Sequence, residues 1–290
     1  MDTSKALVTV HTPDDNDMRV IGSWLETKES DHTRRAYRRI ALNMLAYVNK
    51  SLADITLMDL QGYIATLEGE NSTVALTTNV LKSLFTFTSE TEYTRNVGKL
   101  LHAPKVRDEL AQRILSETDA IRLVTLETNP RNHAMLRLLY HAGLRVSELV
   151  NLKWEDVRET DKGAVLDVLG KGEKLRHVVI TKSMYDELRT LDGAYLGKDR
   201  YVFQSRKGKA GTVPMDTRQV ERMVLDAAKR AGIAGNVSPH WLRHSHVSHA
   251  IDNDTDITVV STSVGHTSLN TTMRYRHLNP EVGSSSGIKI

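Results

Sequence analysis

The chain has 290 residues, 40% of them hydrophobic and 26% charged, so it is large enough for two hydrophobic cores. It contains no cysteine, which excludes disulfides, thiol nucleophiles and zinc–thiolate sites and fits a reducing cytoplasm. The net charge is +3, but residues 1–112 carry 13 Lys and Arg against 15 Asp and Glu, whereas 113–290 carry 26 against 21. This excess of cations in the second part indicates a polyanionic partner.

The N-terminal sequence lacks the apolar core of an export signal, and no later run approaches the length of a membrane span. We therefore expect a soluble, cytoplasmic protein. Residues 1–16 contain Pro13 and a DDND run and are predicted to form an N-terminal arm.

Apolar residues recur every three or four positions from Asp17 to about Asn96, which predicts helices throughout this part. Several of the segments begin with Asp, Ser or Thr, the residues preferred at helix N-termini. The four predicted helices, which would form a small bundle, cover residues 17–28, 31–50, 56–70 and 72–91.

The second predicted helix carries a basic stripe made of Arg34, Arg35, Arg38 and Arg39. A solvated charged surface would normally interleave acids at i,i+4 spacing, but no acid follows Arg34 before Asn49. We therefore favour phosphate contact over a merely solvated face.

A linker is predicted at residues 99–112, between a helical domain at 17–98 and a second domain at 113–278. It contains a proline and mixed charges with little periodicity. Its basic residues Lys99, Lys105 and Arg107 could lie along a ligand that both domains share. Residues 279–290 form a polar tail rich in glycine and serine.

The second domain is predicted to be mainly helical with a small β-sheet. Period-two segments at 164–170 and 175–180 flank a GKGEK turn, which predicts a β-hairpin or a three-stranded sheet. The fold class is therefore mainly α with a small sheet (α+β). The predicted helices cover residues 117–127, 129–143, 144–157, 183–192, 215–232 and 238–252, and two last elements follow at 255–265 and 268–278.

An anion site is predicted where His240 and Arg243 lie one helical turn apart, in a helix that Ser238 would cap and Pro239 would start. Both side chains would project from one face near the positive end of the helix. Taken singly, each would be interpreted as an ordinary capping histidine or surface arginine.

Four histidines at 240, 244, 246 and 249 raise the question of a metal site. His240 and His244 have the i,i+4 spacing of zinc proteases, but no acid stands between them. We therefore predict no metal, and interpret His244, His246 and His249 as packing or hydrogen-bonding residues.

Arg145 follows the Gly143 turn, and Glu148 lies one helical turn beyond it. A guanidinium matches two phosphate oxygens and a nearby carboxylate can orient it, although a surface ion pair has the same pattern. Lys171 lies at the tip of the GKGEK turn, where it could enter a groove or donate a proton. Lys174 is the competing candidate, and a lysine added for solubility is the simpler alternative.

Gly265 and His266 precede Tyr275, which Arg274 and Arg276 flank directly. Tyrosine has a reference pKa of about 10, so it becomes a nucleophile at neutral pH only beside cations and a proton acceptor. The neighbours favour such a role over that of a buried structural tyrosine.

Taken in order, the motifs GLRVSEL, GKG, HWLRH and VGH, with a tyrosine nine residues after the last histidine, resemble the signature of the tyrosine recombinases, the phage-integrase and Xer family. The resemblance covers about 113–278 and extends more weakly to DHTRRAYRR in the helical part. It implies a helical core-binding domain and a catalytic domain that together form a C-shaped clamp on DNA.

The resemblance implies a catalytic set of Arg145, Lys171, His240, Arg243, His266 and Tyr275, supported by Glu148. Tyr275 would attack a DNA phosphodiester and form a 3′-phosphotyrosyl intermediate without metal, ATP or another cofactor. Lys171 would protonate the departing 5′-oxygen, and His240 would act as a general base or hydrogen-bond partner.

The implied partner is a specific site on double-stranded DNA, bound by a homo-tetramer assembled from dimers and associated with the nucleoid. The alternatives are a DNA-relaxing enzyme of the type IB topoisomerase kind and a DNA-binding regulator without catalysis. The predicted DNA-contact residues are Arg34, Arg35, Arg38, Arg39, Lys105, Arg107, Lys174, Arg206, Lys207, Lys209 and Arg218.

Overall fold

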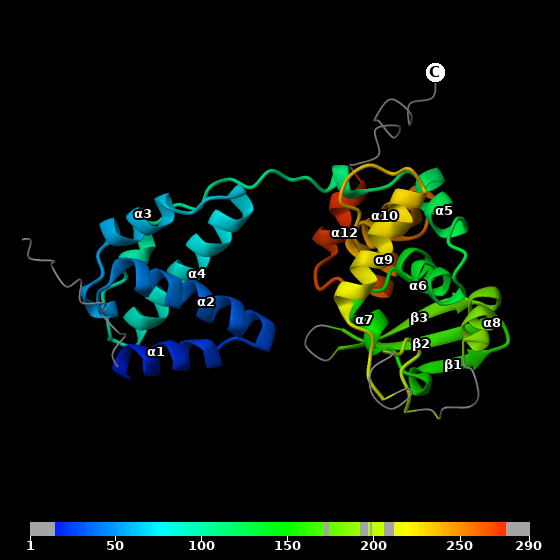
Figure 1. Cartoon of the computed structure of the whole chain (residues 1–290), viewed down its shortest axis with the longest axis horizontal. Coiled ribbons are helices and arrows are strands. Elements are labelled where there is room, and N and C mark those ends of the chain that lie inside the picture. Colours follow the sequence, from blue (N-terminus) through cyan, green and yellow to red (C-terminus); the bar gives the residue numbers. More distant parts are fainter. Residues whose placement is uncertain (1–14, 171–173, 192–196, 198, 206–211, 277–290) are drawn as a thin grey trace, which may run out of the picture. The chain divides into compact units, whose positions relative to one another are not determined.

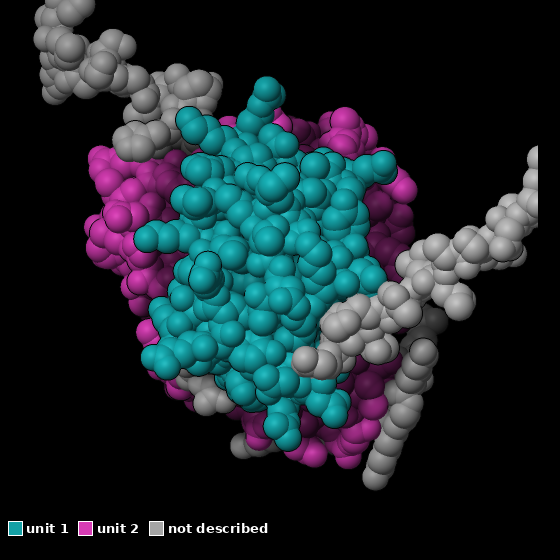
Figure 2. Space-filling model, turned by 90° about the vertical axis from the view of Figure 1, so that its left-hand side faces the viewer, with its two compact units in different colours: residues 1–107 teal, residues 108–290 magenta. Residues whose placement is uncertain are grey.

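The computed structural model describes residues 15–170, 174–191, 197, 199–205 and 212–276. The chain divides into two compact units, Met1–Arg107 and Asp108–Ile290, which Figure 2 draws in different colours. The division falls within the segment 99–112 that was predicted as a linker. Most of the predicted N-terminal arm and the whole predicted C-terminal tail lie outside the described residues.

Unit 1 is helical, and the four helices that the sequence predicted are all present (Figure 1). The side chains of Ser30 and Thr56 each accept a hydrogen bond from the backbone N–H three residues further on, which fixes where α2 and α3 begin. The core lies around Trp24, Met44 and Phe85, each fully buried. The helices are α1 (Asp15–Glu26), α2 (Asp31–Val48), α3 (Leu57–Ala65) and α4 (Asn71–Glu90), with 3₁₀ turns η1 (Leu52–Asp54) and η2 (Val97–Leu100).

Unit 2 combines eight α-helices with one small sheet among its described residues. The helices are α5 (Glu117–Thr125), α6 (Pro130–His141), α7 (Val146–Asn151), α8 (Lys182–Thr190), α9 (Thr217–Arg230), α10 (Pro239–Asp252), α11 (Ile257–Val264) and α12 (Leu269–Arg276), with 3₁₀ turns η3 (Ala111–Arg113) and η4 (Trp154–Asp156).

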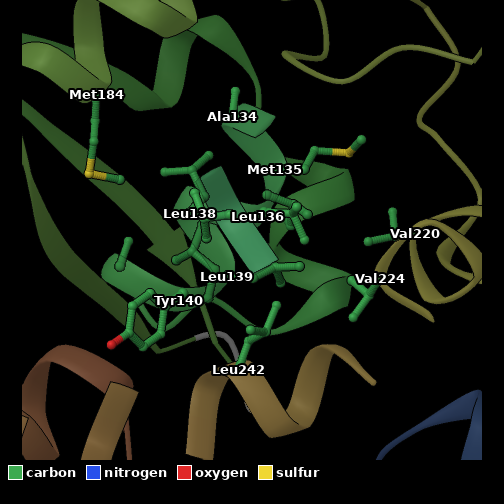
Figure 3. Close-up of a cluster of buried hydrophobic side chains, with 14 of the residues drawn as sticks. Ala134, Met135, Leu136, Leu138, Leu139, Tyr140, Met184, Val220, Val224 and Leu242 are labelled. Carbon is green, nitrogen blue, oxygen red and sulfur yellow. The ribbon is translucent and has the colours of Figure 1, made fainter. Parts of the chain in front are cut away.

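The core of unit 2 is built around α6. Figure 3 shows the α6 side chains between Met184 of α8 on one side and Val220 and Val224 of α9 on the other, with Leu242 of α10 beyond them. Helix α6 is thus buried on several faces, and α10 packs against it.

The sheet is antiparallel, in the order β1 (Val157–Thr160), β2 (Gly163–Leu169) and β3 (Leu175–Thr181). In β3, alternate residues are buried, so that Arg176, Val178 and Ile180 share the inner face. An arginine on this face is unusual, and it reaches the site described below. The third strand confirms the three-stranded alternative over the simple hairpin.

The helix predicted over 144–157 is wrong in its second half. Helix α7 ends at Asn151, and Leu152 is extended, with φ −63° and ψ 126°. The backbone then pairs with a distant segment, because Trp154 N donates to Arg200 O at 3.0 Å and Val202 N donates to Leu152 O at 2.8 Å. This long-range pairing overrides the local helical pattern.

Candidate active site

Three segments meet on one side of unit 2: the Gly143 turn with α7, the buried end of β3, and the α10–α12 region. Backbone carbonyls of both glycine turns accept hydrogen bonds from arginines. Arg243 donates to Gly143 O, and Arg145 Nη2 donates to Gly265 O at 3.2 Å. Residues 100 and 120 positions apart in the chain are therefore held in one cluster.

Glu148 is the buried carboxylate at the centre of this cluster. Its oxygens accept from Arg145 Nη1 at 2.8 Å and from the backbone N of Arg145 at 2.8 Å. They also accept from Arg176 Nη1 and Nη2, at 2.8 and 2.7 Å, in a two-pronged pair. Glu148 therefore orients two arginines rather than the one that the sequence suggested.

The charge of Glu148 is stabilised by this setting. Burial alone would raise its pKa, but the hydrogen bonds from Arg176 and Arg145 outweigh burial and lower the pKa to about 2. Glu148 is therefore ionised at neutral pH, and Arg145 keeps a side chain that is 28% exposed beside it.

Arg243 is buried, with 5% of its surface exposed. It donates to the carbonyls of Gly143 and Val264, so its guanidinium is fixed between the Gly143 turn and the C-terminal end of α11. Burial, followed by the charge of Arg145, lowers its pKa to about 9, which leaves it charged at neutral pH.

Both turns that hold Arg243 require glycine. Gly143 has φ +59°, and a Cβ there would lie 2.5 Å from Cδ2 of His246. Gly265 has φ +66°, and a Cβ there would lie 3.0 Å from Cδ of Arg176. Left-handed backbone and close approach together exclude other residues without rearrangement.

Tyr275, the predicted nucleophile, is 3% exposed and packs with Val247, Val260 and Val264. Its hydroxyl lies 2.6 Å from Nδ1 of His244. Burial raises the pKa of Tyr275 against the opposing charges of Arg243 and Arg274, so the phenol keeps its proton at neutral pH.

The cationic setting that the sequence suggested for Tyr275 is weaker than expected. Arg274 Nη2 donates to Asp108 at 2.6 Å, an exposed pair that neutralises part of its charge. Arg276 is exposed.

His266 lies beside Tyr275, with ring centroids 6.3 Å apart and planes 17° from parallel. Its Nδ1 is 2.8 Å from the buried hydroxyl of Thr272. Burial, followed by the charges of Arg243 and Arg145, lowers the pKa of His266 to about 4, so the ring is neutral at neutral pH.

His240 lies in the first turn of α10, the helix that also carries Arg243, and its side chain is exposed. Its ring lies 6.3 Å from that of His244. Partial desolvation, followed by the charges of Arg243 and Arg145, lowers the pKa of His240.

The remaining histidines of α10 face the interior of unit 2. His249 bonds with the Tyr140 hydroxyl at 2.8 Å and the Leu115 carbonyl at 3.0 Å, and the ring of His246 lies against Gly143. No group of three His, Cys, Asp or Glu that could hold a metal occurs within the described ranges.

Several predicted residues cannot be placed. Lys171, Arg206, Lys207 and Lys209 lie outside the described residues. Lys174 is exposed just before β3, and Arg218 is exposed in the first turn of α9.

None of the helices in the described part of the chain is long and apolar enough to cross a membrane.

Sequence reasoning missed Arg176, and it predicted that His244 packs or hydrogen-bonds without naming Tyr275 as its partner. The signal for Arg176 was its alternation with Val178 and Ile180, which placed a charge on the buried face of a strand. His244 directly follows Arg243, but nothing local showed that it would reach Tyr275.

Comparison with known families identifies both parts of the chain. The phage integrase family model matches residues 105–281, more than half of the chain. The phage integrase N-terminal SAM-like domain matches residues 23–91.

Curated relatives include tyrosine recombinases named XerC. That of Xylella fastidiosa (strain 9a5c) is 31% identical over 268 residues, which cover 88% of this chain and 89% of that protein. That of Thermodesulfovibrio yellowstonii is 29% identical over 273 residues, 88% of each. That of Xanthomonas axonopodis pv. citri is 37% identical over 186 residues, 62% of this chain but 58% of that protein.

Solved structures share the fold at lower identity. A XerH recombinase bound to its difH substrate has a TM-score of 0.68 at 17% identity, covering 93% of this chain and 95% of that one. A lambda integrase dimer bound to a COC′ core site has a TM-score of 0.68 at 19% identity, covering 88% and 95%.

The fold, the arginine-rich site and the relatives together define a site-specific DNA recombinase of the tyrosine class. The chain belongs to the phage integrase family. The resemblance drawn from its motifs is thereby confirmed, and the relaxing enzyme and the non-catalytic regulator are not favoured.

Proposed function

We propose that Tyr275 is the nucleophile that cleaves one strand of duplex DNA, leaving a 3′-phosphotyrosyl bond and a free 5′-hydroxyl. The observation that carries this proposal is the placement of Tyr275 against His244 and His266, where the charge of the fixed Arg243 guanidinium also acts on it. A second 5′-hydroxyl then attacks the phosphotyrosine and completes the exchange. One ester replaces another, so the reaction requires no ATP.

Arg145, Arg243 and His266 stabilise the negative charge that grows on the non-bridging phosphate oxygens. Arg243 is anchored by two carbonyls and Arg145 by Glu148, so neither has to reorganise during the reaction. His266 is neutral and contributes as a hydrogen-bond donor. Fixed donors in a partly desolvated site stabilise developing charge more than mobile ones in water.

Lys171 protonates the departing 5′-oxygen, with Lys174 as the competing donor. Leu169 and Leu175, on either side of the segment that contains Lys171, pair in the sheet. His240 is exposed at the start of α10 and contacts the phosphate as a hydrogen-bond partner.

Arg35, Arg38 and Arg39 contact DNA phosphates from unit 1, since all three are exposed on α2. Arg34 is already engaged: it donates to Lys28 O at 2.9 Å and to Asp31 at 3.2 Å, which leaves it less free for DNA. Lys105, Arg107 and Arg218 are exposed and add phosphate contacts.

Replacing Arg35 and Arg38 together by alanine should weaken DNA binding and reduce the slope of log affinity against log salt concentration by up to about 2, because each lost phosphate contact removes about 0.9. Titrations of a labelled duplex at several salt concentrations measure this slope. Arg19→Ala, at an exposed position on α1, is the control and should leave it unchanged. An unchanged slope in the double variant would remove α2 from the interface.

The active assembly is a tetramer on two paired DNA sites, and it acts in the cytoplasm on nucleoid DNA. Exchange between two duplexes involves four strands, so four nucleophiles serve one round. The absence of cysteine in the sequence agrees with a reducing compartment.

The proposal is tested with a nicked duplex whose short cleaved fragment diffuses away, labelled at one end or the other. We expect a covalent adduct that retains the 5′ label of the fragment upstream of the break. A plasmid carrying two sites then distinguishes exchange from relaxation. Attachment to a 5′-phosphate on the fragment downstream of the break, or relaxed circles without recombinants, would contradict the proposal.

A further inference from the structure

The Tyr275 hydroxyl lies within hydrogen-bonding distance of Nδ1 of His244, at 2.6 Å. The two side chains come from α12 and α10, and their rings are 5.9 Å apart. A separation of 2.6 Å is short for a hydrogen bond between an oxygen and a nitrogen. Nδ1 of His244 therefore contacts the hydroxyl oxygen of Tyr275, the atom that would attack the phosphate.

The direction of this hydrogen bond follows from the two environments. Burial raises the pKa of Tyr275, so the phenol is protonated at neutral pH. Burial, followed by the charges of His240 and Arg243, lowers the pKa of His244 to about 4, so its ring is neutral. Tyr275 is consequently the donor, and the lone pair on Nδ1 of His244 accepts its hydrogen bond.

We infer that His244 is the general base of the cleavage step and takes the tyrosine proton at Nδ1 as the Tyr275 oxygen attacks. This inference rests on the proposed role of Tyr275 as nucleophile. The bond from Tyr275 Oη to phosphorus forms, the bond from phosphorus to the 5′-oxygen breaks, and the Tyr275 proton moves to His244. The departing 5′-oxygen takes its proton from the separate acid, proposed above as Lys171.

The same atom serves the rejoining step. When a 5′-hydroxyl attacks the phosphotyrosine, the Tyr275 oxygen leaves and needs a proton, which His244 Nδ1 returns. Forward and reverse steps thus use one proton on one short path. No second carrier is needed between cleavage and rejoining.

Proton transfer is unfavourable before attack, because a neutral imidazole with a low pKa faces a phenol with a high one. Two changes reverse this during the reaction. The arriving phosphate brings negative charge to Arg243, whose charge adds to burial in lowering the pKa of His244, and bonding to phosphorus makes the Tyr275 oxygen far more acidic. The proton therefore moves with the attack and not ahead of it.

His240 is less well placed for this task. It lies one turn earlier on α10 and is exposed, with its ring 6.3 Å from that of His244. We therefore assign the two histidines different roles: His244 takes the proton of Tyr275, and His240 hydrogen-bonds to the phosphate. This assignment replaces the prediction that His240 could be the general base.

The competing interpretation is a resting latch. Tyr275 is only 3% exposed, so the bond to His244 could hold the nucleophile away from DNA. A latch and a base predict opposite effects when the hydrogen bond is removed.

Two variants separate these roles. His244→Asn places an amide oxygen near the position of Nδ1, where it can accept the Tyr275 hydrogen bond but cannot take the proton. His244→Phe keeps an aromatic ring and removes the acceptor. Cleavage rates are measured on the nicked duplex under single-turnover conditions, with binding of uncut duplex and the thermal unfolding midpoint recorded for each variant. If either variant does not fold, His244→Gln replaces His244→Asn and His244→Leu replaces His244→Phe.

We expect both variants to bind DNA like the wild type and to cleave at least about 100-fold more slowly, within the range that general base catalysis contributes. A His244→Asn rate near that of the wild type would overturn the inference, since hydrogen bonding alone would then suffice. A rate faster than the wild type in either variant would also overturn it and establish the latch. Failure of the proposed function is distinguishable, because the wild type itself would then form no adduct at Tyr275.

Discussion

Replacing Tyr275 by phenylalanine is expected to abolish covalent attachment to DNA while leaving DNA binding intact. The phenyl ring keeps its packing against Val247, Val260 and Val264, so the fold around α12 is retained. Only the attacking oxygen is lost. Loss of the hydroxyl also leaves Nδ1 of His244 without its partner, which costs about 1–3 kcal/mol of stability. Denaturing gels of the enzyme with nicked duplex measure the adduct, and a binding titration measures the affinity.

Tyr140→Phe is the matched control, because its hydroxyl bonds to His249 Nδ1 at 2.8 Å and the side chain is also buried in unit 2. That variant removes a similar tyrosine–histidine bond and should still form the adduct. Persistence of the adduct in Tyr275→Phe would place the nucleophile elsewhere.

Replacing Glu148 by glutamine is expected to destabilise unit 2 by about 3–5 kcal/mol and to slow cleavage strongly. Removing one partner of a buried ion pair leaves the other charge uncompensated, and Arg176 is only 8% exposed. Arg145 loses its orienting carboxylate at the same time. Urea unfolding at neutral pH measures the stability difference, and single-turnover cleavage measures the catalytic effect.

Asp167→Asn is the control for Glu148→Gln. Asp167 pairs with Arg158 at 2.8 Å, and hydrogen bonding from Arg158 likewise lowers its pKa to about 2, but the pair lies on the exposed surface of the sheet. Exposed pairs contribute about 0–1 kcal/mol, so this variant should unfold nearly like the wild type. Equal losses in the two variants would contradict the central position of Glu148.

The stability that Glu148 contributes should depend on pH. Its folded pKa of about 2 lies below the ordinary value of 4.5, so the contribution is complete above about pH 4.5 and is lost as the pH falls toward 2. The stability gap between the wild type and Glu148→Gln should therefore narrow over that interval. A gap that stays constant down to pH 3 would show that the carboxylate charge is not its source.

Local sequence was enough to predict most helices and the residue types of the site. The periodicity of α1 to α4 and of α9 depends on residues three or four positions apart, so it is visible in the sequence itself. The Arg145–Glu148 pair was visible for the same reason, since both residues lie on one helical turn.

The missing parts depend on contacts between distant segments. Arg176 reaches Glu148 only because β3 packs beside α7, and strand β1 forms only because it pairs with β2. The bond between His244 and Tyr275 joins residues 31 positions apart on two helices. The local sequence does not reveal contacts between distant segments. For that reason Arg274 and Arg276 were overestimated as activators of Tyr275.

The most direct measurement of the central claim is identification of the residue that becomes bonded to DNA. The adduct on nicked duplex is trapped and digested with nuclease and protease, and the remaining nucleotide-bearing peptide is sequenced by mass spectrometry. We predict a single modified residue, Tyr275, bonded through its oxygen to a 3′-phosphate. Attachment at another residue, or through a 5′-phosphate, would contradict the account.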